Sequence, residues 1–162
     1  MTEWKKEFGK KLEGLGDYWK HRHDKANAFF KEYGKLLEEI ESACGGPIAT
    51  IQKGQVIVQY YTNDGKQTRM GLESITVRIA ERAMAMSPQI GFENGKSIMR
   101  AVFSVAKGSV VGPRNSLEFV FEDGNAKWAI IGKNNKPETE FKPEMLGELL
   151  SFALIPEHPK TA

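Results

Sequence analysis

The stretch that decides the fold is WKKEFGKKLEGLGDYWKHRHDKANAFFKEYGKLLEEI, residues 4–40. Positions spaced alternately four and three residues apart are almost all apolar, which is the pattern of one face of a helix. This stripe consists of Trp4, Phe8, Leu12, Leu15, Trp19, Arg22, Ala26, Phe29, Tyr33, Leu36 and Ile40. Thr2 can cap the start through its hydroxyl, and the glycines after Cys44 permit a left-handed exit. The sequence therefore predicts a long amphipathic N-terminal helix that ends near Cys44.

Two glycines, Gly14 and Gly16, weaken the first part of this helix. Each costs about 1 kcal/mol in a helix interior, and Asp17 can cap a new helix behind them. An unbroken helix would span about 60 Å, whereas a typical strand offers about 20 Å of sheet to cover it. We therefore favour a helix that breaks at Gly14–Gly16, with both pieces packed on the sheet. A continuous helix would need a further partner for part of its apolar face.

Residues 48–131 change to short alternating apolar segments joined by glycine turns, which is typical of antiparallel hairpins. A two-residue turn at Asp123–Gly124 places Phe119 opposite Trp128 and Leu117 opposite Ile130. Further turns are expected at Lys53–Gly54, at Asn63–Asp64–Gly65 and at Asn94–Gly95. Each turn sets a register in which the apolar side chains of its two strands share one face.

The registers of the other hairpins follow from the same rule. The turn at Lys53–Gly54 puts Ala49 and Ile51 on one face with Val56 and Val58. With Gly65 left-handed in a three-residue turn, Val58 and Tyr60 align with Met70 and Thr68. The turn at Asn94–Gly95 puts these side chains on one face: Ile90, Phe92, Met99, Ala101, Phe103 and Val105. The result is a mainly antiparallel sheet of about six to seven strands with an apolar face for a helix to cover.

Two further segments have helical spacing. Leu72 to Met86 fits a helix, although Ile75, Val77 and Ile79 also alternate as a strand would; we favour the helix. A C-terminal helix is expected from Pro143 to the residues before Pro156. The predicted fold class is therefore α+β, with a single domain over residues 1–156 and a mobile tail over residues 157–162.

Composition narrows the class of protein. The chain has 162 residues, 40% of them hydrophobic, which suits one globular domain. The net charge of +2 argues against nucleic acid as a partner, because that function needs clustered basic residues. The start, Met1 to Lys6, lacks the apolar centre of a secretion signal, and Cys44 is the single cysteine. We expect the mature chain to be the whole chain, in the cytoplasm.

Candidate motifs for cofactors and metals do not have the residue spacing that such motifs require. Gly91 to Ser97 has three residues between its glycines where a phosphate-binding loop needs four, and Asn94–Gly95 is a hairpin signal. His21 and His23 lie two apart on a helix and so point in different directions, whereas chelation needs a spacing of three or four. We expect no metal, no cofactor and no catalytic residues that the sequence can identify.

Polar and basic side chains are expected on the second face of the sheet. The candidate ligand-binding residues there are Gln59, Tyr61, Arg69, Arg100 and Glu118. Arg69 and Arg100 could hold a carboxylate or phosphate by paired hydrogen bonds. The alternative, which we favour, is an exposed face with cross-strand ion pairs, such as Glu118 with Lys127 or an arginine.

The helix stripe is the candidate interaction surface, through Trp4, Phe8, Leu12 and Trp19. Its lysines and aromatic rings resemble those of helices at a membrane surface, but interspersed acidic residues dilute that charge. We therefore expect a non-enzymatic binding or adaptor protein that forms a homodimer and engages a partner protein or a small anionic ligand. The alternative is an enzyme or small-molecule sensor with its site around Arg69 and Arg100.

Overall fold

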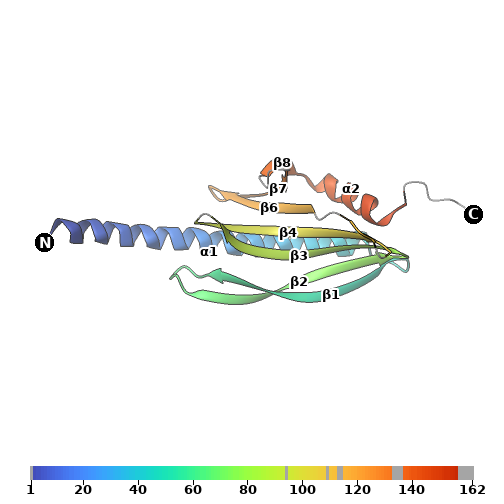
Figure 1. The fold of residues 1–162 in the computed structure, drawn as a ribbon, viewed down its shortest axis with the longest axis horizontal. Helices are drawn as coiled ribbons and strands as arrows, with labels where there is room; N and C mark the ends of the chain where they lie inside the picture. Colours follow the sequence, from blue (N-terminus) through green and yellow to red (C-terminus); the bar gives the residue numbers. More distant parts are fainter. Residues whose placement is uncertain (1, 94, 109, 113–114, 133–136, 157–162) are drawn as a thin grey trace, which may run out of the picture.

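The fold is an antiparallel sheet packed around one long helix, with a second helix at the C-terminus (Figure 1). This computed structural model describes residues 2–93, 95–108, 110–112, 115–132 and 137–156. The elements are α1 (Glu3–Ala43), β1 (Thr50–Tyr61), β2 (Gln67–Ile79), β3 (Arg82–Glu93), β4 (Lys96–Lys107), β5 (Val110–Val111), β6 (Asn115–Glu122), β7 (Asn125–Ile131), β8 (Pro137–Phe141) and α2 (Pro143–Leu154). The predicted α+β class is confirmed, and the tail expected at residues 157–162 lies outside the described residues.

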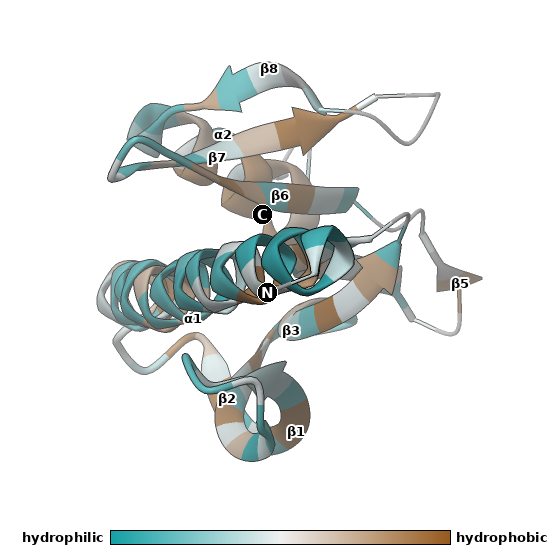
Figure 2. Cartoon of the chain, turned by 90° about the vertical axis from the view of Figure 1, so that its left-hand side faces the viewer, coloured by the Kyte–Doolittle hydropathy of each residue, from teal (hydrophilic) through white to brown (hydrophobic). Residues whose placement is uncertain are grey.

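The sheet curves around α1. Its strand order is β1-β2-β3-β4-β6-β7-β8, with every neighbouring pair antiparallel and β5 attached to β4. Figure 2, which looks almost along α1, shows β1 and β2 below the helix, β3 beside it and β6 to β8 above it. The concave face of the sheet is therefore the face that α1 covers.

Three predicted hairpin registers are confirmed. Phe119 lies opposite Trp128 and Leu117 opposite Ile130. Ile90 lies opposite Met99, which is the register that a turn at residues 94–95 requires. Val58 lies opposite Met70, with Gly65 in the left-handed region at φ 79° and the Thr62 N–H donating to the Lys66 carbonyl over 2.9 Å. Turn chemistry alone was sufficient to place these strands.

The turn predicted at Lys53–Gly54 is wrong. Both residues lie inside β1, where Lys53 pairs with Ile75 and Gly54 with Ser74. A β-carbon at Gly54 would lie 2.9 Å from Ser74 Oγ, so this glycine leaves room for the neighbouring strand. Glycine in a strand can thus mark a close cross-strand contact where sequence reasoning sees a turn.

The helix predicted over residues 72–86 is also wrong. This segment contains the end of β2 and the start of β3, with Ile79 opposite Arg82 across a two-residue turn at Ala80–Glu81. Ala80 has φ 52°, a conformation that residues other than glycine, asparagine and aspartate seldom adopt. Because the sequence has no turn residue there, the helical spacing was misleading.

The break predicted at Gly14–Gly16 is absent, because α1 is one continuous helix from Glu3 to Ala43. Strands β1 to β4 have 12 or 13 residues, so each is about 40 Å long, twice the length assumed from typical strands. The part of α1 from Tyr18 onward is also about 40 Å long. Long strands therefore cover that part of the helix, and the first part extends beyond them.

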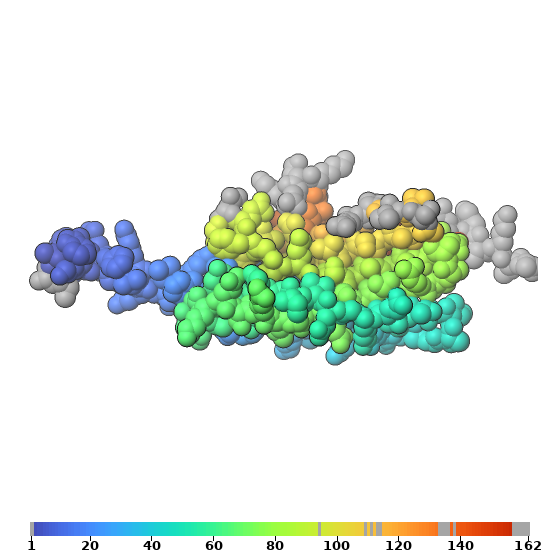
Figure 3. All heavy atoms as spheres, turned by 60° about the horizontal axis from the view of Figure 1, so that its bottom comes forward, coloured from blue at the N-terminus to red at the C-terminus, as the bar shows by residue number. Residues whose placement is uncertain are grey.

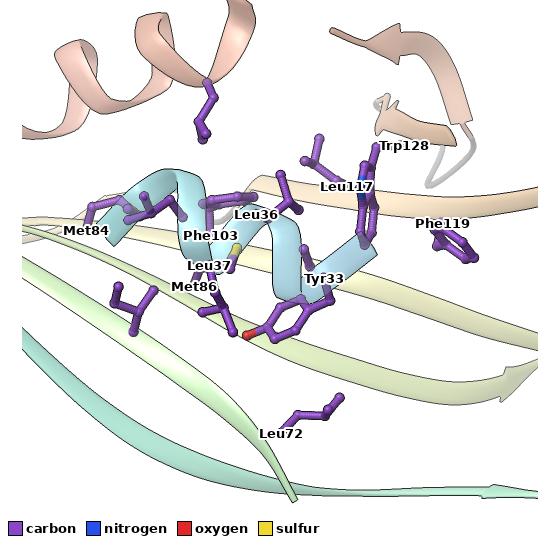
Figure 4. Close-up of a cluster of buried hydrophobic side chains, with 14 of the residues drawn as sticks. Tyr33, Leu36, Leu37, Leu72, Met84, Met86, Phe103, Leu117, Phe119 and Trp128 are labelled. Atoms are coloured by element: carbon purple, nitrogen blue, oxygen red, sulfur yellow. The ribbon is translucent and has the colours of Figure 1, made fainter. Parts of the chain in front are cut away.

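The hydrophobic core lies between the second part of α1 and the concave face of the sheet (Figure 4). The helix contributes Ala26, Phe29, Tyr33, Leu36, Leu37 and Ile40, all buried. Phe29 meets the rings of Phe119 and Trp128 edge-on, each with its centroid 5.7 Å away. α2 begins at Pro143 and ends before Pro156, as predicted, and buries Leu146, Leu150, Ala153 and Leu154 in the same core.

Tyr33 links α1 to β2 through a buried hydrogen bond. Its hydroxyl donates to the Glu73 carbonyl over 2.6 Å, and the side chain is 1% exposed. Burial, followed by the nearby Glu73 carboxylate, raises the pKa of Tyr33 above its ordinary value. The phenol therefore keeps its proton in the folded protein at pH values where the unfolded chain loses it.

We expect Tyr33→Phe to lower the free energy of unfolding by about 1 kcal/mol at neutral pH, the typical contribution of one hydrogen bond. Above pH ~10 the unfolded state releases the Tyr33 proton while the folded state keeps it. The contribution of Tyr33 to the free energy of unfolding therefore falls by up to about 1.4 kcal/mol per pH unit. The variant lacks that contribution and should lose stability less steeply. Denaturant unfolding of both proteins from pH 7 to 11 measures the difference, and parallel stability curves would contradict it.

Candidate functional site

The sheet separates into three hairpins toward the N-terminal end of α1. β2 pairs with β3 only over Ile75–Ile79, and β4 pairs with β6 only over Arg100–Phe103. Beyond these points the hairpins β1-β2, β3-β4 and β6-β7 continue individually. Their turns lie at the same end of the molecule, around the helix (Figures 1 and 2).

Each of the three hairpins contacts α1 between residues 18 and 25. The Trp19 ring lies against the turn of β1-β2, so close that a β-carbon at Gly65 would be 2.8 Å from it. The Tyr18 hydroxyl donates to the Gly95 carbonyl in the turn of β3-β4 over 2.8 Å. His21 lies beside Phe121 of β6, with ring centroids 6.1 Å apart. We call helix residues 18–25 and these three hairpin ends the collar.

The helix continues outward from the collar as an exposed segment. This projecting segment, residues 3–17, extends from the body of the molecule in Figure 3. Four residues of the apolar stripe are exposed there: Trp4 by 63%, Phe8 by 56%, Leu12 by 51% and Leu15 by 40%. From Ala26 onward the same stripe is core. A single apolar face thus packs on the sheet in one half of the helix and meets solvent in the other.

Within the collar, Arg22 fills the gap between the β1-β2 and β3-β4 hairpins. Its guanidinium carbon lies 4.6 Å from the centre of the Tyr61 ring and 4.5 Å from that of Phe92. Tyr18 supplies a third ring at 5.5 Å. A cavity of about 300 Å³ opens beside this cluster. Aromatic rings, not aliphatic side chains, surround Arg22, and such rings pack favourably against a guanidinium. This explains how a charged residue occupies a position of the apolar stripe.

Lys25 lies where β4 and β6 separate. Its ammonium group donates to the Ser97 carbonyl over 2.8 Å, on the part of β4 that has no ladder partner in β6. Burial lowers the pKa of Lys25; Glu118 opposes the shift, while Lys96 and Arg22 add to it by charge repulsion. The side chain therefore satisfies a backbone carbonyl at the cost of desolvating its charge.

The five predicted ligand-binding residues do not form one cluster. Gln59 accepts a hydrogen bond from Gln67 over 2.7 Å, and Tyr61 contacts Arg22, so both line the cavity at the collar. Arg69 is exposed on β2, opposite Gln59. Arg100 and Glu118 form a half-buried cross-strand ion pair at 3.3 Å, the arrangement expected under the ion-pair alternative. Arg100 is thus already paired with an acidic side chain.

The predicted interaction residues divide between the projecting segment and the collar. Trp4, Phe8 and Leu12 are exposed, whereas Trp19 is half-buried at the collar. Arg22 and Phe92 were not predicted as site residues. A charged residue in an otherwise apolar stripe was the signal available for Arg22, while Phe92 was indistinguishable from a core residue.

Comparisons with protein-family models, with curated proteins and with solved structures found no match for this chain. Neither helix is long and apolar enough to cross a membrane, over the residues that the structure describes. In the same part of the chain, no three His, Cys, Asp or Glu side chains group as a metal would require.

Gly65→Ala tests the contact between the collar and Trp19. Both Gly65 and Gly124 adopt positive φ, at 79° and 76°, so alanine at either should cost about 1–2 kcal/mol of stability. A new β-carbon at Gly65 also meets the Trp19 ring, whereas one at Gly124 meets nothing within 4 Å. We expect Gly65→Ala to cost more than Gly124→Ala in denaturant unfolding and to change tryptophan fluorescence. Equal losses would show that Trp19 is not held there.

Proposed function

We propose that this is a binding protein that dimerises through the projecting segment, with a second copy of the same chain as the occupant of the exposed stripe. The observation that carries the proposal is the row of Trp4, Phe8, Leu12 and Leu15, all exposed on a helix whose same face is core further along. Large apolar side chains gathered on one exposed face mark an interaction surface.

The projecting segment is a weak helix by itself. Gly9, Gly14 and Gly16 each cost about 1 kcal/mol relative to alanine, and none has a neighbour within 4 Å that would require glycine. Isolated helices of about 15 residues are marginal in water. Covering the stripe would add about 1.5–3 kcal/mol for each large side chain that becomes fully buried. A partner therefore supplies the stabilisation that this helix lacks.

A second copy in antiparallel orientation fits the charges beside the stripe. Glu7 and Lys11 lie four residues apart along one edge of it. In an antiparallel dimer, this edge of one copy lies beside the same edge of the other copy, which runs in the opposite direction. Glu7 of each copy then lies opposite Lys11 of the other. Phe8 and Leu12 are then the stripe residues nearest the centre of the contact, with Trp4 beside Leu15 of the second copy.

The length of the projecting segment fits the same pairing. Placing Glu7 opposite Lys11 centres the contact at Gly9, so Glu3 of the second copy lies opposite Leu15. The collar begins three residues later, at Tyr18, so the two bodies do not collide. The overlap of residues 3–15 is about 20 Å long. Such a contact is smaller than a standard protein interface, and we therefore expect a weak, concentration-dependent dimer.

Replacing Phe8 and Leu12 together by alanine tests the contact. Alanine preserves the helix while removing the central apolar side chains. We expect the dimer dissociation constant of the full chain to rise about tenfold or more, because each dimer loses four large side chains. Light scattering over a range of concentrations measures it.

The matched control replaces Lys6 and Lys10, on the opposite side of the helix, by alanine in the same way. It should leave the dissociation constant nearly unchanged. A native chain that is monomeric at every concentration tested, or equal weakening by both double variants, would contradict self-association through the stripe.

A charge exchange tests the antiparallel register. Glu7→Lys and Lys11→Glu each place like charges opposite one another in their own homodimers, so each variant alone should associate more weakly than the native chain. When the two variants are mixed, every pair across the contact becomes opposite in charge. We expect the mixture to dimerise more strongly than either component, as measured by light scattering at low ionic strength.

High salt is the control for this experiment, since screening should bring the mixture and its components together. A mixture that associates no better than its components at low ionic strength would disprove the proposed register.

A further inference from the structure

The cavity at the collar lies where β2 and β3 diverge and α1 passes between the hairpins. Its volume is about 300 Å³, at the lower end of the range for small-molecule sites. Polar side chains on one part of its wall include Arg22, Gln59 and Gln67, and apolar ones on another include Ile90, Phe92 and Met99. Convergent polar groups beside an apolar wall are the usual composition of a ligand site.

Arg22 is a half-buried cation without an anion. Among the described residues it forms no ion pair, and its Nε is buried with no hydrogen-bond partner. Within the described part of the chain its single hydrogen bond is a long contact of 3.5 Å from Nη1 to the Tyr18 hydroxyl. Buried charges in proteins are normally paired, because loss of hydration is otherwise uncompensated. Arg100 also has a buried Nε with no hydrogen-bond partner, but Glu118 already pairs with its guanidinium, so Arg22 differs in its lack of an acidic partner among the described residues.

The surroundings of Arg22 favour an anion. Lys25 is near enough for Arg22 and Lys96 to disfavour its charged form. Glu118, the acidic group that acts on Lys25, is itself bound to Arg100. The aromatic rings of Tyr61 and Phe92 lie against the guanidinium of Arg22. Rings interact with the face of a guanidinium and carboxylates with its edge, so an anion and the rings can bind Arg22 together.

We propose that this cavity binds a small monocarboxylate with a flat apolar body. The carboxylate accepts hydrogen bonds from Arg22, and the body lies against Phe92, Ile90 and Met99. A single guanidinium matches the two oxygens and the single charge of one carboxylate, whereas the described residues that line the cavity include no second cation for a phosphate dianion. At about 30 Å³ for each water-sized group, the cavity has room for about ten non-hydrogen atoms.

Gln59 and Gln67 give the site a second polar position. The Gln67 amide donates to the Gln59 carbonyl oxygen, and the other amide groups of this pair are able to bond a polar substituent on the ligand. The site therefore includes two residues of the sequence-based prediction, Gln59 and Tyr61, but takes Arg22 as its cation in place of Arg69 or Arg100.

Benzoate is a suitable probe, because it has one carboxylate, a flat ring and nine non-hydrogen atoms, about what the cavity can hold. Benzamide is the neutral control of the same shape, and inorganic phosphate is the control for general anion binding. Isothermal titration calorimetry of the full-length protein should detect benzoate binding and little binding of either control. Amide chemical shifts of Gly91 and Phe92 should move during the benzoate titration.

Variants locate the site. Arg22→Met keeps an unbranched apolar stem and removes the charged guanidinium, and we expect benzoate affinity to fall about tenfold or more. Arg22→Lys keeps the charge without the planar fork and should have intermediate affinity. Arg69→Gln, which removes an exposed arginine on the neighbouring strand, should retain native affinity. Circular dichroism verifies that each variant is folded.

Three outcomes would overturn the proposal: no detectable benzoate binding, unchanged affinity in Arg22→Met, or loss of binding in Arg69→Gln. Benzamide or phosphate that binds as tightly as benzoate would overturn the assignment to carboxylates. If Arg22→Met does not fold, Arg22→Lys decides the role of the arginine, and native affinity in that variant would count against the paired hydrogen bonds.

Discussion

The structure depends on the packing of the second half of α1 into the concave face of the sheet. Phe29 meets Phe119 and Trp128, and Tyr33 bonds the backbone of β2, so one helix joins strands from opposite ends of the strand order. Because strands β1 to β4, β6 and β7 all contribute buried side chains to the core around this helix, the curvature of the sheet follows from the need to surround it. The same packing fixes the direction in which α1 leaves the sheet.

The collar follows from the separation of the hairpins. The pairing of β2 with β3 and of β4 with β6 ends early, so the hairpins part toward one end of the sheet. Long polar side chains of α1 enter the resulting gaps: Arg22 between two aromatic rings, and Lys25 at an unpaired carbonyl.

The two proposed sites lie next to each other on α1 and use different physical forces. Burial of aromatic and aliphatic surface would stabilise contact between projecting segments, with charge selecting the orientation. Pairing of an isolated cation would drive binding in the cavity, where partial burial strengthens the interaction of Arg22 with an anion. Tyr18 lies at the boundary, since its hydroxyl bonds the β3-β4 turn and its ring faces Arg22.

Local signals in the sequence were enough to place several elements. Helical spacing and the glycines after Cys44 placed α1, and the turn residues around Gly65, Gly95 and Gly124 set three strand registers. Local signals failed at two places. The turn at Ala80 contains no residue typical of turns, and Gly54 is a glycine that makes room for the neighbouring strand, not a turn. The structure shows α1 continuous through Gly14 and Gly16, although a β-carbon at either position would have no neighbour within 4 Å. Tertiary structure alone places Arg22 in a cavity without an acidic partner among the described residues, because strand lengths and the places where strands part depend on contacts between residues distant in sequence.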